Sequence, residues 1–213
     1  MWSKVQSESA AKSRQVITPL GEQMKYLVLY LVLVVMLFLP FLVPAAEKAA
    51  RPVVLPDFVL EVPENPRHKE YLGLTGKTGT DFSIRDIDAD ILVIELFSMY
   101  CPYCQKEAPA VNELYAKMRE TSKNGPVVKI IGLGVANSQF EVDHFRDTYK
   151  VAFPLFADED KTIFRALAGE GTPTFIGCRL KDGERPVIVL RQNGGFASSA
   201  TFLQELLDKG GPQ

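Results

Sequence analysis

The feature that most constrains the fold is residues 91–97, a seven-residue segment that is apolar except for Glu95. It ends shortly before a Cys-Pro-Tyr-Cys motif at 101–104. A near-continuous apolar run of this length is typical of a central strand that is buried on both faces of a sheet. Pro102 is suited to the first turn of a helix, and apolar residues then recur at helical spacing over 108–118. The sequence therefore predicts that the cysteines lie where a buried strand gives way to a helix.

Strands and helices alternate along the rest of the chain. Upstream of residue 91 we predict a short strand at 58–60, a loop at 61–69 and a hairpin with a glycine-rich turn at 71–87. Downstream, the patterns predict strands over 127–135, 153–156, 174–176 and 186–190, and helices over 140–149, 161–167 and 196–207. This order predicts an α/β domain with a central mixed sheet flanked by helices.

Composition excludes several classes of protein. Apolar residues make up 46% of the 213 residues and charged residues 23%, which is an ordinary globular balance. Residues 1–46 carry four basic and two acidic side chains, which leaves 20 basic and 24 acidic side chains, a net charge of −4, for the rest. That part offers no basic field for nucleic acid. Three cysteines are too few for a disulfide scaffold and point to chemistry instead.

The N-terminal region predicts export. No charge occurs over residues 26–46, and Lys25 precedes this apolar segment. We divide the chain into a cytoplasmic segment 1–25, a signal peptide or membrane anchor 26–46, a linker 47–55 and a domain 56–213. Cleavage and retention both stay open, and Met24 is a candidate for the true start. The positive flank places the domain outside the cytoplasm, in the periplasm or its equivalent.

The two cysteines of the motif are expected to have different roles. Unpaired N–H groups and the dipole at a helix start favour a thiolate, so Cys101 is the predicted nucleophile. Cys104 lies one turn deeper and is the predicted resolving thiol, which breaks the mixed disulfide between substrate and Cys101. The alternatives are a zinc site, for which Cys178, His68 and His144 are the remaining candidates, and a pair of inert thiols.

At this point the chain resembles a known family. The segment ELFSMYCPYCQKEAP is similar to the active-site segment of the thioredoxin superfamily, and Cys-x-x-Cys-x-x-Glu-x-Pro resembles the TlpA/ResA-type members. The likeness extends over about 56–209 and includes the opening LPDFVL. It implies a thioredoxin-like fold with an N-terminal hairpin and an inserted strand–helix unit at 127–149.

The resemblance also implies a substrate-facing surface. Thr172-Pro173 matches the cis-proline of the family, which lies against the cysteine pair and positions the substrate backbone. Pro102 and Tyr103 separate the cysteines and complete this surface. The same dipeptide occurs in glutaredoxins, and because Tyr103 lacks the positive charge of a histidine, we expect a moderate redox potential.

Two acids are candidates for proton transfer. Glu95 stands in the otherwise apolar segment 91–97, where a buried carboxylate needs a partner or a proton, so its pKa is expected to be raised. It matches the buried acid of thioredoxin, which implies proton exchange with Cys104. A sheet-edge carboxylate paired with a lysine is the alternative. Glu107, by the same resemblance, modulates the pair or is an ordinary solvated glutamate. Cys178 reads as a small buried hydrophobe or a second-site thiol.

These residues predict an extracytoplasmic enzyme that reduces disulfides in exported proteins, such as apocytochrome c, with electrons from a membrane carrier. It needs no cofactor or metal and binds no nucleic acid; residues 26–46 would attach it to the membrane if they are not cleaved. A disulfide-forming oxidase is an alternative within the same fold. A peroxiredoxin-like peroxidase fits less well, because Ile94 stands where its motif has proline. A copper-delivery or redox-sensing module represents a different class.

Overall fold

The computed structural model describes residues 20–38, 53–180 and 184–211 and divides the chain into two units, residues 1–50 and 51–213. In the first unit, α1 (Leu20–Phe38) is a helix of 19 residues. Among the described residues, no helix combines the length and the apolarity that a membrane crossing requires. The predicted export segment 26–46 overlaps α1, and its residues 39–46 lie outside the described part of the chain, as do residues 1–19.

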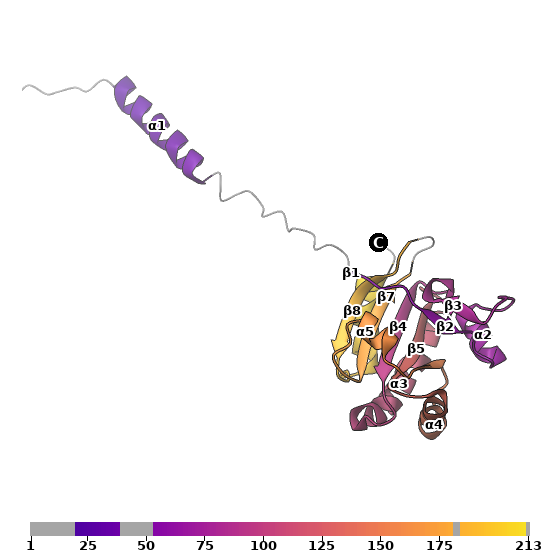
Figure 1. The fold of residues 1–213 in the computed structure, drawn as a ribbon. Coiled ribbons are helices and arrows are strands. Elements are labelled where there is room, and N and C mark those ends of the chain that lie inside the picture. Colours follow the sequence, from indigo (N-terminus) through magenta and orange to yellow (C-terminus); the bar gives the residue numbers. More distant parts are fainter. Residues whose placement is uncertain (1–19, 39–52, 181–183, 212–213) are drawn as a thin grey trace, which may run out of the picture. The chain divides into compact units, whose positions relative to one another are not determined.

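The second unit is built around a mixed sheet with β4 (Ile91–Phe97) near its middle. All seven residues of β4 are buried, as predicted from their apolar run. β4 pairs in parallel with β5 on one side and antiparallel with β7 on the other. Within the described residues the sheet has six strands in the order β1-β8-β7-β4-β5-β6 (Figure 1). The other five strands are β1 (Val53–Val54), β5 (Val128–Val135), β6 (Leu155–Asp158), β7 (Thr174–Arg179) and β8 (Val187–Asn193).

Two hydrophobic clusters cover the two faces of this sheet. The first contains alternate residues of β4, among them Val93 and Phe97, and packs against three helices. The second contains the intervening residues of β4, among them Ile94, and packs against the N-terminal segments and α5 (Thr162–Ala166). The helices of the first face are α3 (Pro102–Thr121), α4 (Gln139–Tyr149) and α6 (Ser199–Gly210). The predicted α/β domain with a central mixed sheet is confirmed.

The region before β4 differs from the prediction. The expected loop at 61–69 contains the start of a helix, α2 (Pro66–Leu72), because Asn65 caps it by accepting the Arg67 N–H at 3.0 Å and Pro66 occupies its first turn. The expected hairpin at 71–87 was therefore misplaced. The antiparallel pair consists of β2 (Val59–Glu61) and β3 (Asp81–Ser83), with α2 inside their connection.

The start of the domain was also placed too late. Val53 and Val54, assigned to the linker 47–55, form β1 and pair antiparallel with β8 at the edge of the sheet. Leu55 is buried beside them. A two-residue edge strand carries too little pattern to be found in a sequence, because its partner lies more than 130 residues further along the chain.

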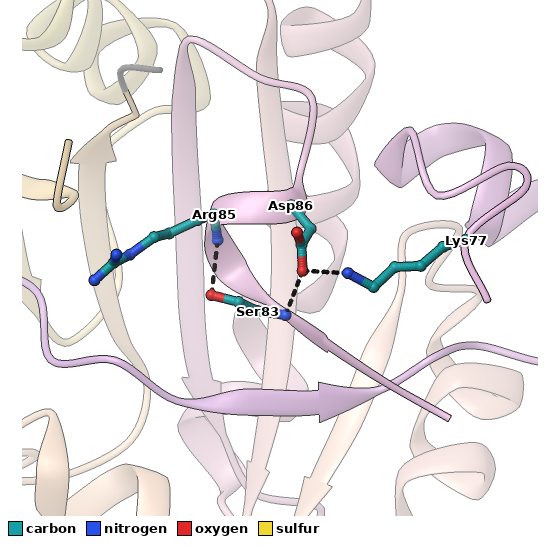
Figure 2. A network of polar contacts seen from close by, with 4 residues as sticks. All are labelled: Lys77, Ser83, Arg85 and Asp86. Carbon is teal, nitrogen blue, oxygen red and sulfur yellow. Dashed lines mark hydrogen bonds and ion pairs between the residues drawn. The ribbon is translucent and has the colours of Figure 1, made fainter. Parts of the chain in front are cut away.

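A polar network fixes the turn between β3 and β4. The Asp86 carboxylate accepts the Ser83 N–H at 2.7 Å and lies 2.5 Å from Lys77 Nζ, while the Ser83 hydroxyl accepts the Arg85 N–H at 3.2 Å (Figure 2). This capping box caps the N-terminal end of the short 3-10 helix η2 (Ile84–Asp86). Burial of Ile84 on η2 then anchors the turn against the second face of the sheet.

Candidate active site

Cys101 occupies the N-cap of α3, directly beyond the buried strand β4. Its backbone is extended, with φ −85° and ψ 111°, and its sulfur accepts the Cys104 N–H at 3.3 Å. Pro102 follows in the first turn, where the missing N–H costs nothing. The predicted position of the motif at a strand-to-helix junction is confirmed, and it brings the sulfur close to the unpaired N–H groups of a twenty-residue helix.

The environments of the two thiols differ. Partial burial raises the pKa of Cys101, but hydrogen bonds from the side chains of Cys104 and Thr172 and from backbone N–H groups outweigh it, so the pKa is lowered. Cys104 is fully buried, and desolvation together with its hydrogen bond to Cys101 raises its pKa. Both are free thiols in this structure. This asymmetry matches a nucleophile and a resolving thiol.

The loop before β7 forms the opposite wall of the site. The Thr172–Pro173 peptide bond is cis, as predicted. The Thr172 carbonyl accepts a hydrogen bond from the Cys101 thiol at 3.3 Å, and the Pro173 carbonyl accepts the Gly194 N–H at 2.8 Å. A cavity of about 220 Å³ opens beside this loop. Thr172 is therefore adjacent both to the Cys101 sulfur and to this cavity.

Glu95 lies in the interior, on the face of β4 that α3 covers. It is 3% exposed, and the alternation along β4 places it with Val93 and Phe97, in the cluster that contains Cys104. Desolvation, and then the nearby charge of Glu107, raise the pKa of Glu95 to about 8. No basic side chain pairs with it among the residues that the structure describes. The alternative of a sheet-edge carboxylate paired with a lysine is therefore excluded.

Glu107 links α3 to the loop between β8 and α6. Its carboxylate accepts the Phe196 N–H at 3.0 Å and packs against Gly195. It is half-buried rather than fully solvated, and its charge acts on Glu95. The structure thus places Cys101, Cys104 and Glu107 at the start of α3 and Glu95 on the face of β4 that α3 covers, while their roles stay predictions.

Pro102 and Tyr103 are both exposed beside Cys101, and 74% of Tyr103 is accessible to solvent. This exposure fits contact with a substrate and leaves Tyr103 free of the buried cluster. Tyr100, which precedes Cys101, is exposed as well. Its hydroxyl donates to the Glu141 carboxylate, which also forms the capping box of α4.

Asn137 is a positioning residue that the sequence did not reveal. It is fully buried, and its Oδ1 accepts the Met99 N–H at 2.8 Å, two residues before Cys101. Together with Tyr100 and Glu141, it ties the active-site loop to the unit formed by β5 and α4. Asn137 belongs to no motif. The only signal was a polar side chain directly after an apolar strand.

Cys178 lies away from the pair. It is buried in β7 within the second cluster, on the face of the sheet opposite Cys104, and desolvation raises its pKa to about 12. In the described part of the chain, no group of three or more His, Cys, Asp and Glu side chains could hold a metal ion. Cys178 therefore behaves as a small buried hydrophobe in this fold.

The fold and the site together define a class: a thioredoxin-like protein whose Cys-x-x-Cys pair is arranged for thiol–disulfide exchange. Residues 55–194 match the AhpC/TSA family. Because this match covers more than half of the chain, the protein belongs to the AhpC/TSA family. The inserted β5–α4 unit lies within the matched range.

Relatives of the chain agree with this class. It is 26% identical over 98 residues to the thiol-disulfide oxidoreductase ResA of Halalkalibacterium halodurans, which covers 46% of this chain and 53% of the relative. ResA of Bacillus anthracis is 27% identical over 101 residues, or 47% of this chain and 56% of the relative. The chain thus spans about half the length of these curated relatives.

Solved structures share the fold. StoA from Bacillus subtilis superposes with a TM-score of 0.50 and 19% identity over 72% of this chain and 98% of its own. A thiol:disulfide interchange protein of the thioredoxin family from Chlorobium tepidum superposes with a TM-score of 0.52 and 18% identity. The match covers 76% of this chain and 99% of that protein. At this level of identity, the likeness shows the architecture.

Proposed function

We propose that this protein is a thiol–disulfide oxidoreductase that reduces disulfides in exported proteins. One observation carries the proposal: a partly exposed thiol with a lowered pKa and a buried thiol with a raised pKa share the first turn of α3, opposite the cis-proline loop. A pair of inert core thiols would not need this asymmetry. The names of the ResA relatives support the same activity.

The reducing cycle moves two electrons from the dithiol to the substrate. The Cys101 thiolate attacks one sulfur of the substrate disulfide, the substrate S–S bond breaks, and the other substrate sulfur leaves as a thiolate. The Cys104 thiol then passes its proton to the Glu95 carboxylate and attacks Cys101 Sγ. The mixed disulfide breaks, the second substrate sulfur leaves and takes up the proton, and the Cys101–Cys104 disulfide remains. A dithiol reductant restores the pair by the reverse exchange.

The environment of Cys101 supports the reducing direction. A disulfide is strongly oxidising when its reduced form is stabilised, as happens when a cation holds the thiolate. Here hydrogen bonds lower the pKa of Cys101, and no cationic side chain among the described residues contributes. Tyr103 also brings no positive charge to the helix start. The reduced form therefore gains only moderate stabilisation.

Location and partners extend the proposal. The uncharged segment 26–46 behind Lys25 supports export, with the domain held at or released from the outer side of a membrane. There, a membrane carrier would supply the electrons, and exported proteins with vicinal cysteines, such as apocytochrome c, would be substrates.

The redox potential and the turnover of insulin test the proposal. A potential near about −270 mV with rapid insulin reduction supports a reductase, whereas one near about −120 mV with net disulfide formation identifies an oxidase. Turnover of peroxide would identify a peroxidase. Cys104→Ser should accumulate a mixed disulfide with substrate, and Cys101→Ser should form none. Full exchange activity in Cys101→Ser would overturn the proposal, and Cys178→Ala is the matched control that should keep the activity.

A further inference from the structure

The cavity beside the cis-proline has one acidic lining residue, Glu170, and shares Thr172 with the surroundings of the Cys101 sulfur. Its volume is about 220 Å³, and its lining includes Glu170, Thr172 and Asn193. Thr172 both lines the cavity and contacts the reactive thiol, because its carbonyl oxygen lies 3.3 Å from Cys101 Sγ. In a mixed disulfide, the sulfur of the substrate cysteine lies about 2.05 Å from Cys101 Sγ. The residues next to that substrate cysteine would therefore lie close to Thr172, at the mouth of the cavity.

A chain of hydrogen bonds orients the carboxylate of Glu170. The Asn193 amide donates to Glu170 Oε2 at 3.2 Å, and Asn193 Oδ1 lies 3.4 Å from the Thr174 hydroxyl oxygen. The same hydroxyl donates to the Gly171 carbonyl at 2.8 Å. Thr174 and Asn193 face each other across β7 and β8, so the carboxylate is attached to the rigid part of the sheet.

No opposite charge pairs with this carboxylate among the residues that the structure describes. Among the described residues, no lysine, arginine or histidine forms an ion pair with Glu170; Arg191, two residues from Asn193, instead donates to the Leu167 carbonyl at 2.7 Å. An oriented carboxylate of this kind, at the edge of a cavity, is complementary to a cation. A lysine or arginine side chain would supply both that charge and hydrogen-bond donors.

We propose that this cavity receives a basic side chain next to the disulfide cysteine of the substrate, and that Glu170 is the residue that determines this specificity. The inference rests on the proposed oxidoreductase function, since it assumes that a polypeptide disulfide reacts at Cys101. An exported substrate with Lys or Arg beside its cysteine is preferred over one with Asp or Glu. The preference acts on the encounter with Cys101 and on the mixed disulfide, not on the proton transfers.

The test uses short peptides that contain one internal disulfide and differ only in the two residues that flank a cysteine, which are both Lys, both Gln or both Glu. Flanking both sides covers either direction of binding. Each kcat/KM is divided by the rate constant for reduction of the same peptide by dithiothreitol, because charge also changes the reactivity of the peptide itself. The full-length protein is compared with Glu170→Gln and Glu170→Lys. The control is Asp147→Asn, which removes an exposed charge near the far end of α4.

The expected result is a preference of about 2- to 5-fold for the Lys peptide over the Glu peptide at low salt, as for an exposed ion pair, which shrinks as salt is added. Glu170→Gln should remove the preference, Glu170→Lys should reverse it, and Asp147→Asn should retain it. Equal rates for the three peptides with the unchanged protein, or a preference that survives Glu170→Lys, would overturn this inference alone. If none of the peptides is reduced, the proposed function itself fails.

Discussion

The carboxylate of Glu107 lies so close to Gly195 that a Cβ atom on residue 195 would stand 2.4 Å from Glu107 Oε2. The same carboxylate accepts the Phe196 N–H, and Gly194 donates its N–H to the Pro173 carbonyl. One short loop therefore contacts both the acid that acts on Glu95 and the cis-proline of the loop before β7. Substitutions in this loop should therefore alter both the position of the Glu107 carboxylate and that of the cis-proline loop.

Substitution Gly195→Ala is expected to displace the Glu107 carboxylate and weaken its bond to Phe196. The protein should lose about 1 kcal/mol of stability, the typical value of one hydrogen bond, and the pKa of Glu95 should fall because a negative charge moves away from it. Urea unfolding and a ¹³C NMR titration of the Glu95 carboxyl measure the two effects. Gly171→Ala is the control, because a Cβ there meets nothing within 4 Å. An unchanged Glu95 titration would contradict the coupling.

Reduction of insulin is expected to depend on the ionisation of Glu95. Its carboxylate form accepts the proton of Cys104, and with a pKa of about 8 this form increases as the pH rises from 6 to 8. The ratio of the rate of the unchanged protein to that of Glu95→Gln should therefore rise over this range and level off only from about one pH unit above the pKa of Glu95. The ratio cancels the ionisation of Cys101, which both proteins share. A ratio that is independent of pH would remove Glu95 from the proton transfer.

Glu95 should also make stability depend on pH. Its pKa is about 8 in the folded protein, against an ordinary value of 4.5 in the unfolded chain, so between these two values the folded state binds the extra proton. The stabilisation is complete below the unfolded pKa and is lost as the pH rises through the folded pKa, at no more than about 1.4 kcal/mol per pH unit. The free energy of unfolding of the unchanged protein, measured with denaturant, should therefore decrease from pH 5 to pH 8 relative to that of Glu95→Gln. Parallel curves for the two proteins would refute the raised pKa.

Cys104→Ala is expected to raise the pKa of Cys101. The Cys104 side chain provides the first of the hydrogen bonds that lower this pKa against the cost of burial. The alkylation rate of Cys101 by iodoacetamide, followed against pH, reports its thiolate directly. The midpoint should move upward in Cys104→Ala, whereas Cys178→Ala should leave it in place. A midpoint that does not move would mean that the Thr172 side chain and the backbone N–H groups hold the thiolate without the Cys104 side chain.

Asn137→Ala is expected to cost about 1–3 kcal/mol, because it leaves the Met99 N–H without its acceptor inside the protein. Reductase activity should fall as well, since Met99 is part of the loop that positions Cys101. Asn137→Asp keeps an oxygen for Met99 and should retain more activity than Asn137→Ala. Thermal unfolding and insulin reduction, measured on the same samples, separate stability from positioning. Equal losses in the two variants would argue against the role of that oxygen.

The parts of the fold with a strong local signal were predictable from sequence. Residues 91–97 are apolar except for Glu95 because both faces of β4 are covered, and Pro102 marks the start of α3. The helix at Pro66 was missed because Asn65-Pro66 occurs both in loops and at helix starts, and only the tertiary fold decides between them. β1 could not be predicted because its formation depends on pairing with β8, which is distant in the sequence.

The candidate site divides in the same way. The cysteines, Glu95 and Pro173 follow motifs, so residue type and spacing located them. The contact of Glu107 with Phe196 joins residues 89 positions apart, and Asn137 approaches Met99 only after β4 and β5 pair. No local pattern encodes such contacts, because each depends on which elements the completed fold places side by side.

The position of Cys178 has a consequence for the fate of a trapped substrate. β7 directs Cys178 into the cluster on one face of the sheet, while Cys104 lies in the cluster on the other. A polypeptide held on Cys101 can therefore be released within the molecule through a single exit, attack by Cys104. In the proposed cycle, the sheet thus keeps Cys178 from competing with Cys104 for the substrate held on Cys101.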